Sequence, residues 1–259
     1  MEFKEKRPLY LLSEIASTLR GDKGCAWDKD QTSKTLKPYL IEEAYEVYDA
    51  IEDGDISNIK EELGDLLYQV YAHSQIASEE KFFDIDDVAN NIIEKLIRRH
   101  PHVFHDERIL DKKSVIDRWE KIKMEEKSER ESILDGVPRH MPSLLKAYRI
   151  QQKVSRVGFD WNRIEDVARK LDEEILEFKN ALSQNAKEKI VEEFGDILFT
   201  LVNISRFLAI NPEDALSCTI NKFMKRFRYV EREVVKNKKS LDKMSIDELD
   251  ELWEKAKES

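Results

Sequence analysis

The chain has 259 residues, of which 38% are charged, and its formal net charge is −10. This acidic balance argues against binding of duplex nucleic acid, because no basic excess is present to replace the counterions on phosphates. No apolar run approaches the roughly 18 residues that a membrane-spanning helix needs, and the N-terminus lacks a signal-peptide pattern. We therefore expect a cytoplasmic protein without membrane contact. Only seven glycines and six prolines, with abundant Glu, Lys, Leu and Ile, predict an all-α chain.

Two pairs of acidic residues mark a first predicted helical hairpin. Glu43 and Glu46 are three residues apart, as are Glu62 and Asp65, so the two members of each pair share one helix face. The sequence Asp53-Gly54-Asp55 between the pairs is a turn signal. It predicts two antiparallel helices that bring the acidic pairs face to face.

Four carboxylates on one hairpin call for a cation. Two carboxylates about 5 Å apart repel each other by roughly 3 kcal/mol at an effective dielectric constant of about 20. Hard divalent ions with oxygen ligands match such donors, which predicts Mg²⁺ with Mn²⁺ as a substitute. The alternative is a set of solvated helix faces in a highly charged chain. Apolar residues flanking the acidic pairs favour the metal site.

Basic residues close the next predicted helix. Lys95, Arg98 and Arg99 come directly before His100-Pro101, and Lys95 and Arg99 are four residues apart on one face. A cationic pair in the same unit as a carboxylate cluster suits a phosphate-bearing ligand that a metal ion bridges. The alternative is that these side chains only complement the dipole at the C-terminus of the helix.

A second copy of this pattern follows a linker over about residues 124–141, which contains the turn Gly136-Val137-Pro138. A helix over 143–155 is expected to open the second unit. We predict two tandem repeats, residues 1–130 and 131–259. The acidic residues of the second copy follow those of the first by 131 residues and are Glu174, Glu177, Glu193 and Asp196. The basic residues of the second copy are Lys222, Lys225 and Arg226.

The four tryptophans also follow the repeat. Trp27 and Trp119 are 92 residues apart, and the same spacing separates the two tryptophans of the second half. An aromatic ring and an ammonium group lie four residues apart in two pairs, Trp119 with Lys123 and Trp253 with Lys257. In each pair the ring is able to stack on a base and the ammonium group to contact a phosphate. Burial in the core is the alternative for both tryptophans.

Several motifs together resemble the MazG family over essentially the whole chain. They are the doubled Glu-Glu-x-x-Glu and Glu-x-x-Asp pattern, Gly24-Cys25-Ala26-Trp27-Asp28, Arg98-Arg99-His100-Pro101-His102-Val103-Phe104 and Arg156-Val157-Gly158-Phe159-Asp160-Trp161. The resemblance implies an all-α nucleoside triphosphate pyrophosphohydrolase in which each repeat contributes a metal-binding hairpin to a core like a four-helix bundle. It implies Mg²⁺-dependent cleavage of NTPs and dNTPs to the monophosphate and pyrophosphate.

The resemblance also assigns roles to residues at matching positions. Apart from the resemblance, the position of Glu42 and Glu173 next to the acidic stripes makes them candidates for a general base or for a group that orients the metal ligands. The implied metal ligands are Glu43, Glu46, Glu62, Asp65, Glu174, Glu177, Glu193 and Asp196. The implied substrate contacts are Lys95, Arg98, Arg99, Trp119, Lys123, Lys189, Lys222, Arg226, Trp253 and Lys257. One departure is visible, since the first unit has Asn58 where the second has Lys189.

Two other classes of protein compete with this interpretation. A di-iron bundle also uses inward-facing glutamates, but it requires Glu-x-x-His, and Asp65 and Asp196 stand at the corresponding positions. A helical adaptor that only senses nucleotides would bind them without releasing pyrophosphate. Whatever its function, a hairpin of this size buries its apolar stripe best against another hairpin, which predicts a homodimer or higher homo-oligomer.

Overall fold

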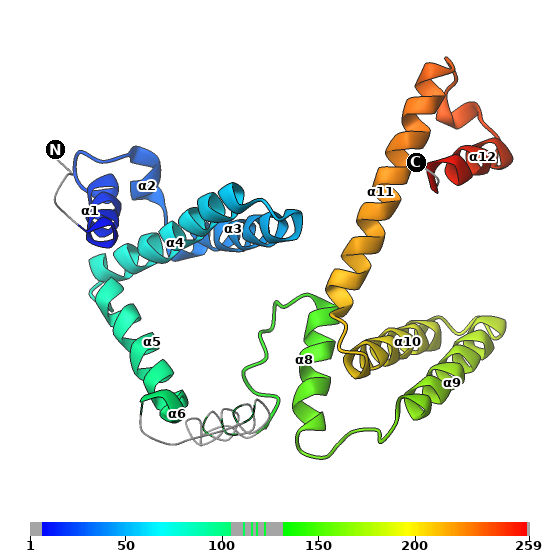
Figure 1. The fold of residues 1–259 in the computed structure, drawn as a ribbon, viewed down its shortest axis with the longest axis horizontal. Coiled ribbons are helices and arrows are strands. Elements are labelled where there is room, and N and C mark those ends of the chain that lie inside the picture. Colours follow the sequence, from blue (N-terminus) through cyan, green and yellow to red (C-terminus); the bar gives the residue numbers. More distant parts are fainter. Residues whose placement is uncertain are drawn as a thin grey trace. The chain divides into compact units, whose positions relative to one another are not determined.

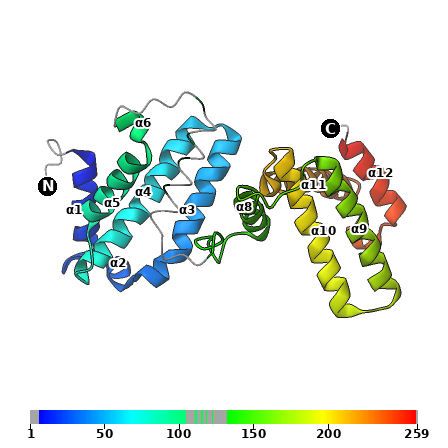
Figure 2. The ribbon, with the colours of Figure 1, turned by 90° about the horizontal axis from the view of Figure 1, so that it is seen from below.

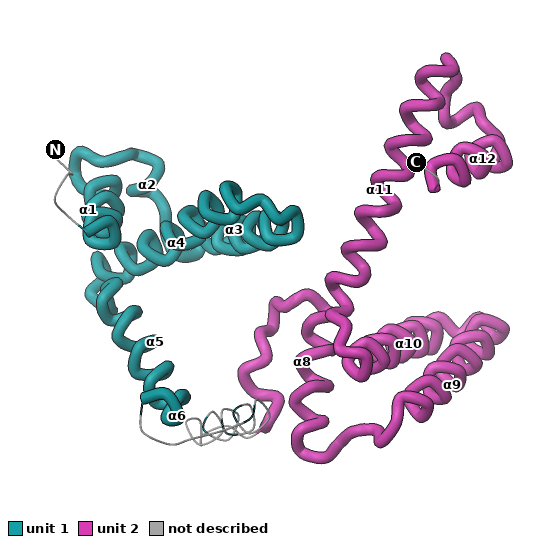
Figure 3. The backbone as a smooth tube through the Cα atoms, viewed as in Figure 1, with its two compact units in different colours: residues 1–126 teal, residues 127–259 magenta. Residues whose placement is uncertain are grey.

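The computed structural model describes residues 7–104, 111, 115, 118, 122 and 132–257. Within these residues the secondary structure is entirely helical, which confirms the predicted all-α class (Figure 1). The chain forms two compact units, residues 1–126 and 127–259 (Figure 3). The predicted boundary between residues 130 and 131 falls outside the described residues and stays a prediction. None of the helices in the described ranges is both long and apolar enough to cross a membrane.

The first unit is built around a hairpin of two long helices, α3 and α4, which lie side by side (Figure 2). Helix α1 packs on α4 and is followed by the short α2, while α5 leaves the C-terminal end of α4. The helices of this unit are α1 (Pro8–Arg20), α2 (Ala26–Asp30), α3 (Ser33–Asp53), α4 (Ile56–Glu79), α5 (Ile85–Arg99) and α6 (Pro101–Phe104).

Local sequence signals explain where the first hairpin begins and turns. A capping box of Thr32 and Thr35 starts α3 by satisfying otherwise unpaired backbone N–H groups. Gly54 ends this helix at φ +70°, in the left-handed region that favours glycine. The Asp55 side chain then accepts hydrogen bonds from the backbone N–H groups of Ser57 and Asn58 and starts α4. The predicted turn at residues 53–55 is therefore confirmed.

The second unit repeats the hairpin with α9 and α10. Helix α8 packs against α10, and the long α11 contacts both α8 and α12. The predicted helix over 143–155 is confirmed as α8. The elements are α8 (Ser143–Ser155), α9 (Ile164–Ser183), α10 (Lys187–Phe207), α11 (Pro212–Lys236), the 3-10 helix η1 (Leu241–Lys243) and α12 (Ile246–Lys257).

The two hairpins turn differently but keep the same spacing between their acidic residues. Residues 54–55 join the helices of the first hairpin, and residues 184–186 join those of the second, with Asn185 in the left-handed region at φ +53°. Helix α9 ends nine residues after Glu174, whereas α3 ends ten residues after Glu43. This difference of one residue compensates for the loop of the second hairpin, which is one residue longer. The distance along the chain from Glu43 to Glu62 therefore equals that from Glu174 to Glu193.

Each hairpin leaves part of its apolar stripe exposed. In the first unit Leu36, Ala72 and Ile76 form a small buried cluster. Leu67 on α4 is nevertheless 38% exposed, and Leu198 at the matching position of α10 is 40% exposed. Leu63 and Phe194, one turn earlier, are also exposed. The same apolar face is therefore exposed in both units.

Candidate functional site

The hairpin of the first unit gathers three of its four predicted ligands. Carboxylate oxygens of Glu43 on α3 and of Glu62 and Asp65 on α4 lie within 4.8 Å of one another. The spacing of three residues between Glu62 and Asp65 places both on the side of α4 that faces α3. Glu46, the fourth predicted ligand, is close enough to Glu62 to raise its pKa. The first acidic pattern therefore converges in space.

These first-unit carboxylates repel one another in the absence of a cation. Burial raises the pKa of Glu43, and the charges of Asp65 and Glu46 raise it further. The pKa of Glu62 is also raised, by loss of solvation and then by Glu46. The neutral Gln69 amide offsets part of this repulsion, because its Nε2 donates to Oε1 of Glu43 at 3.3 Å. A bound cation would relieve the repulsion.

The second unit gathers a slightly different trio. Carboxylate oxygens of Glu174, Glu177 and Glu193 lie within 4.8 Å of one another. Glu174 and Glu193 are buried, and Oε2 of Glu193 has no hydrogen-bond partner among the described residues. The charge of Glu193 is the largest cause of the raised pKa of Glu177. Asp196 is exposed and lies outside this trio.

Two lysines belong to the second cluster. Lys170 Nζ lies 2.8 Å from Oε1 of Glu174 and 2.7 Å from Oε1 of Glu173. Lys189 Nζ lies 2.8 Å from Oε1 of Glu193. The hydrogen bond from Lys189 lowers the pKa of Glu193, and its bonds to the carboxylates raise the pKa of Lys189 to about 12. The second cluster is thus partly neutralised by the protein itself.

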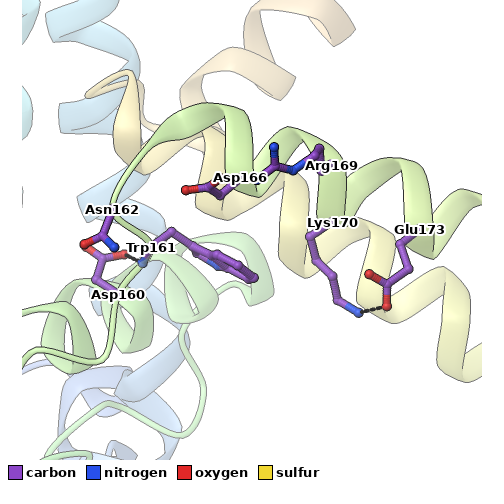
Figure 4. Close-up of a pocket in the computed structure, with 7 residues that line it drawn as sticks. All are labelled: Asp160, Trp161, Asn162, Asp166, Arg169, Lys170 and Glu173. Atoms are coloured by element: carbon purple, nitrogen blue, oxygen red, sulfur yellow. Dashed lines mark hydrogen bonds and ion pairs between the residues drawn. The ribbon is translucent and has the colours of Figure 1, made fainter.

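A cavity of about 380 Å³ adjoins this cluster (Figure 4). Figure 4 shows the Trp161 ring on one side and the ion pair of Lys170 with Glu173 on the other. Asp160 is held by Arg206 of α10, whose Nη1 donates to Oδ2 at 2.9 Å. The residues that line the cavity are Asp160, Trp161, Asn162, Asp166, Arg169, Lys170 and Glu173. Candidate base Glu173 therefore faces a hollow with room for part of a ligand.

The predicted substrate contacts of the first unit are only partly described. Lys95, Arg98 and Arg99 lie in the last two turns of α5, as the sequence predicts. Trp119 and Lys123 lie outside the described residues. Glu42, the candidate base of this unit, is exposed beside Glu43 on α3.

In the second unit, two of the residues that were predicted to contact the substrate lie next to each other. The guanidinium carbon of Arg226 on α11 lies 5.9 Å from the centre of the Trp253 ring on α12, a cation-π distance. Phe223 packs against the same ring with centroids 5.0 Å apart. Lys257 forms an ion pair with Glu254. No hydrogen bond among the described residues joins Lys222 or Arg226 to the carboxylates of α9 and α10.

Sequence reasoning missed Gln69 and Lys170. Both had a usable signal, since Gln69 follows Asp65 by four residues and Lys170 precedes Glu174 by four, so each lies on the acidic stripe of its helix. Positions four residues from a predicted ligand therefore contain useful information about the groups that support it.

Comparison with known proteins agrees with the geometry. The family model for the MazG nucleotide pyrophosphohydrolase domain matches residues 31–104 and 163–230, the segments that contain the two hairpins. The chain is 47% identical to the "Nucleoside triphosphate pyrophosphohydrolase/pyrophosphatase MazG" of Thermotoga maritima, over 95% of this chain and 94% of that protein. It is 41% identical to the "Nucleoside triphosphate pyrophosphohydrolase" of Escherichia coli K12, over 91% of each.

A longer relative, the "Uncharacterized protein YabN" of Bacillus subtilis, is 46% identical over 99% of this chain and 54% of its own length. The two matched segments of the family model and the matches to the Thermotoga maritima and Escherichia coli proteins confirm the resemblance that the motifs indicated. The chain belongs to the MazG nucleotide pyrophosphohydrolase family.

Proposed function

We propose that this protein is a Mg²⁺-dependent nucleoside triphosphate pyrophosphohydrolase that acts on both NTPs and dNTPs. It would cleave the bond between the α- and β-phosphates and release the monophosphate and pyrophosphate. The observation that carries the proposal is the convergence of three carboxylates within 4.8 Å on each of two hairpins. The names of the relatives at 47% and 41% identity support the same reaction.

The donor set suits a hard divalent cation. Each cluster consists of carboxylates, without histidine or cysteine, and such oxygen donors favour Mg²⁺ or Mn²⁺ over iron. Oε2 of buried Glu193, which lacks a partner in the described chain, is an acceptor that a cation would satisfy. The residues that would bind the ion are, in the first unit, Glu43, Glu46, Glu62 and Asp65 and, in the second, Glu174, Glu177, Glu193 and Asp196. When bound, the ion neutralises phosphate charge and polarises the phosphorus under attack.

The protein's own groups would supply proton transfer and charge. Glu42 and Glu173 are exposed beside the clusters, where either carboxylate could accept a proton from an attacking water. The basic groups on α5 and α11, together with Lys189, would contact the triphosphate and stabilise charge on the leaving pyrophosphate. Trp119 with Lys123, and Trp253 with Lys257, would bind the nucleoside end. The guanidinium of Arg226 lies at a cation-π distance from the ring of Trp253, a pairing that suits a base-binding surface.

Product analysis tests this function. The wild-type protein, Glu43→Gln, Glu193→Gln and the double variant are incubated with each NTP and dNTP and Mg²⁺, and the products are separated. We expect monophosphate and pyrophosphate from the wild type, less from each single variant and none from the double variant. Release of a nucleoside diphosphate and inorganic phosphate, or nucleotide binding without turnover, would falsify the proposal.

We also propose that the protein works as a homo-oligomer in the cytoplasm. The matching exposed leucines on α4 and α10 support assembly, because an uncovered apolar helix face gains free energy when a second hairpin covers it. Cys25 and Cys218 are free thiols, which suits a reducing compartment. The absence of duplex nucleic acid among its partners stays a prediction from the net charge.

A further inference from the structure

The two carboxylate clusters differ most in the positively charged side chains that lie beside them. In the second unit, Lys170 and Lys189 bring ammonium groups within 2.8 Å of Glu174 and Glu193. The side chains of these two glutamates are 6% and 1% exposed, so little water is available to screen their charge. Both ion pairs span four residues of one helix, which fixes them by local geometry.

The described part of the first unit shows no such cations beside its carboxylates. The same offset of 131 residues that relates Glu43 to Glu174 places Tyr39 at the position of Lys170 and Asn58 at that of Lys189. Among the described residues no lysine or arginine forms an ion pair or hydrogen bond with Glu43, Glu46, Glu62 or Asp65. The neutral amide of Gln69 is the donor that contacts the cluster. Within the described residues, no lysine or arginine therefore offsets the negative charge of the first cluster.

We propose that the two sites have different affinities for a divalent cation: the first unit binds it tightly on its own, whereas in the second unit the cation must displace Lys170 and Lys189. This inference rests on the proposed function only for the identity of the sites. Lys170 and Lys189 then act as built-in counterions, which hold the second cluster together without metal and weaken its affinity for it. The chain would thus fill its two sites in order as the metal concentration rises.

The expected difference in affinity follows from the charges. Each ammonium group lies 2.8 Å from a carboxylate oxygen, and its side chain is about one-third to one-half exposed. At the dielectric constant of water, such a group lowers the affinity of the site for a divalent cation several-fold. Two such groups together predict a difference of about tenfold between the sites.

Mn²⁺ binding without nucleotide tests the proposal. Free Mn²⁺ is measured by electron paramagnetic resonance as the metal-free full-length protein is titrated. We expect two classes of site whose dissociation constants differ by about tenfold. The pair Glu43→Gln and Glu62→Gln should remove the tighter class, and the pair Glu174→Gln and Glu193→Gln the weaker one.

Lysine variants then identify the cause. Lys170→Met with Lys189→Met keeps the aliphatic stems and should tighten the weaker class about tenfold. Lys179→Met, an exposed lysine on α9, changes the net charge equally per substitution and should leave both classes unchanged. If the double lysine variant does not fold, Asn58→Lys is the reciprocal test, and it should weaken the tighter class several-fold.

Two results would overturn the proposal. One is equal affinity at the two sites of the wild type, and the other is a folded lysine variant whose weaker class stays unchanged. Neither measurement depends on hydrolysis. A protein that shows the expected order of filling but no pyrophosphate release would contradict the proposed function alone.

Discussion

The Gln69 side chain, buried on α4, donates a hydrogen bond from Nε2 to Oε1 of Glu43 across the first hairpin at 3.3 Å. This contact fixes the only α3 member of the first trio relative to its two partners on α4. The position that matches Gln69 in the second unit is Thr200, which is also buried but is too short to form the same bridge. Gln69 is thus a positioning residue that belongs to the first site alone.

Replacement of Gln69 by leucine should weaken the first site without unfolding the hairpin. Leucine fills a similar volume and removes the buried Oε1, which has no partner among the described residues, so the cost to stability should be small. Loss of a group that orients a metal ligand typically reduces metal affinity by about 10- to 100-fold. Mn²⁺ titration should show this loss in the tighter class, with helical circular dichroism retained. Unchanged Mn²⁺ binding in Gln69→Leu would contradict the assigned role.

An ion pair between Arg20 and Glu79 should make the stability of the first unit depend on pH. Arg20 Nη2 and Nε donate to the Glu79 carboxylate at 2.7 and 2.9 Å, which joins α1 to the end of α4. This hydrogen bond lowers the pKa of Glu79. A lowered folded-state pKa gives stability that is present above the ordinary pKa of glutamate and is lost as the pH falls through the folded-state value.

Glu79→Gln should therefore reduce the free energy of unfolding at neutral pH and have little effect in acid. Because Glu79 is 39% exposed, solvent screening limits the expected loss to about 1 kcal/mol. Urea unfolding at neutral and acidic pH measures both values. Glu80→Gln, the exposed neighbour, is the matched control and should change neither. An equal loss for Glu79→Gln at both pH values would show that the ion pair contributes nothing.

The turn of the first hairpin provides a test of backbone conformation. Gly54 has φ +70°, and nothing lies within 4 Å of the position that a Cβ would take. Gly54→Ala should therefore destabilise the unit through backbone strain alone, by about 1 kcal/mol. Gly54→Asn should cost less, because asparagine tolerates this region, as Asn185 does in the second hairpin. Thermal unfolding of both variants checks the order; equal losses would point to side-chain packing instead.

The sequence predicted most of the hairpin geometry because that geometry is local. Helix periodicity put Glu62 and Asp65 on one face, and the left-handed preference of Gly54 fixed the turn. Helix periodicity could not predict which of the carboxylates come together in each cluster. Asp65 joins the first trio while its counterpart Asp196 stays outside the second, because the side-chain rotamers and the packing between two helices decide which oxygens converge. Lys170 was missed because its signal, a position four residues before Glu174, is weak in a chain with 38% charged residues.

The exposed apolar face of each hairpin predicts the behaviour of a charge placed there. Leu67 and Leu198 occupy matching positions on α4 and α10 and are 38% and 40% exposed. If another hairpin covers these leucines in the assembled protein, a buried and unpaired carboxylate would cost several kcal/mol at each position. Leu67→Asp with Leu198→Asp should therefore dissociate the oligomer, and sedimentation velocity should show a shift from the assembled form to the monomer.

A control separates this effect from a general effect of added charge. Ile246 is 78% exposed at the start of α12, where an acidic residue suits the helix dipole, so Ile246→Asp should leave the sedimentation coefficient unchanged. Both leucine positions flank the carboxylates of their helices, so dissociation should also lower hydrolysis, because an uncovered hairpin holds its ligands less rigidly. Monomers with full activity would show that each hairpin works alone, and a wild type that sediments as a monomer would remove the case for assembly.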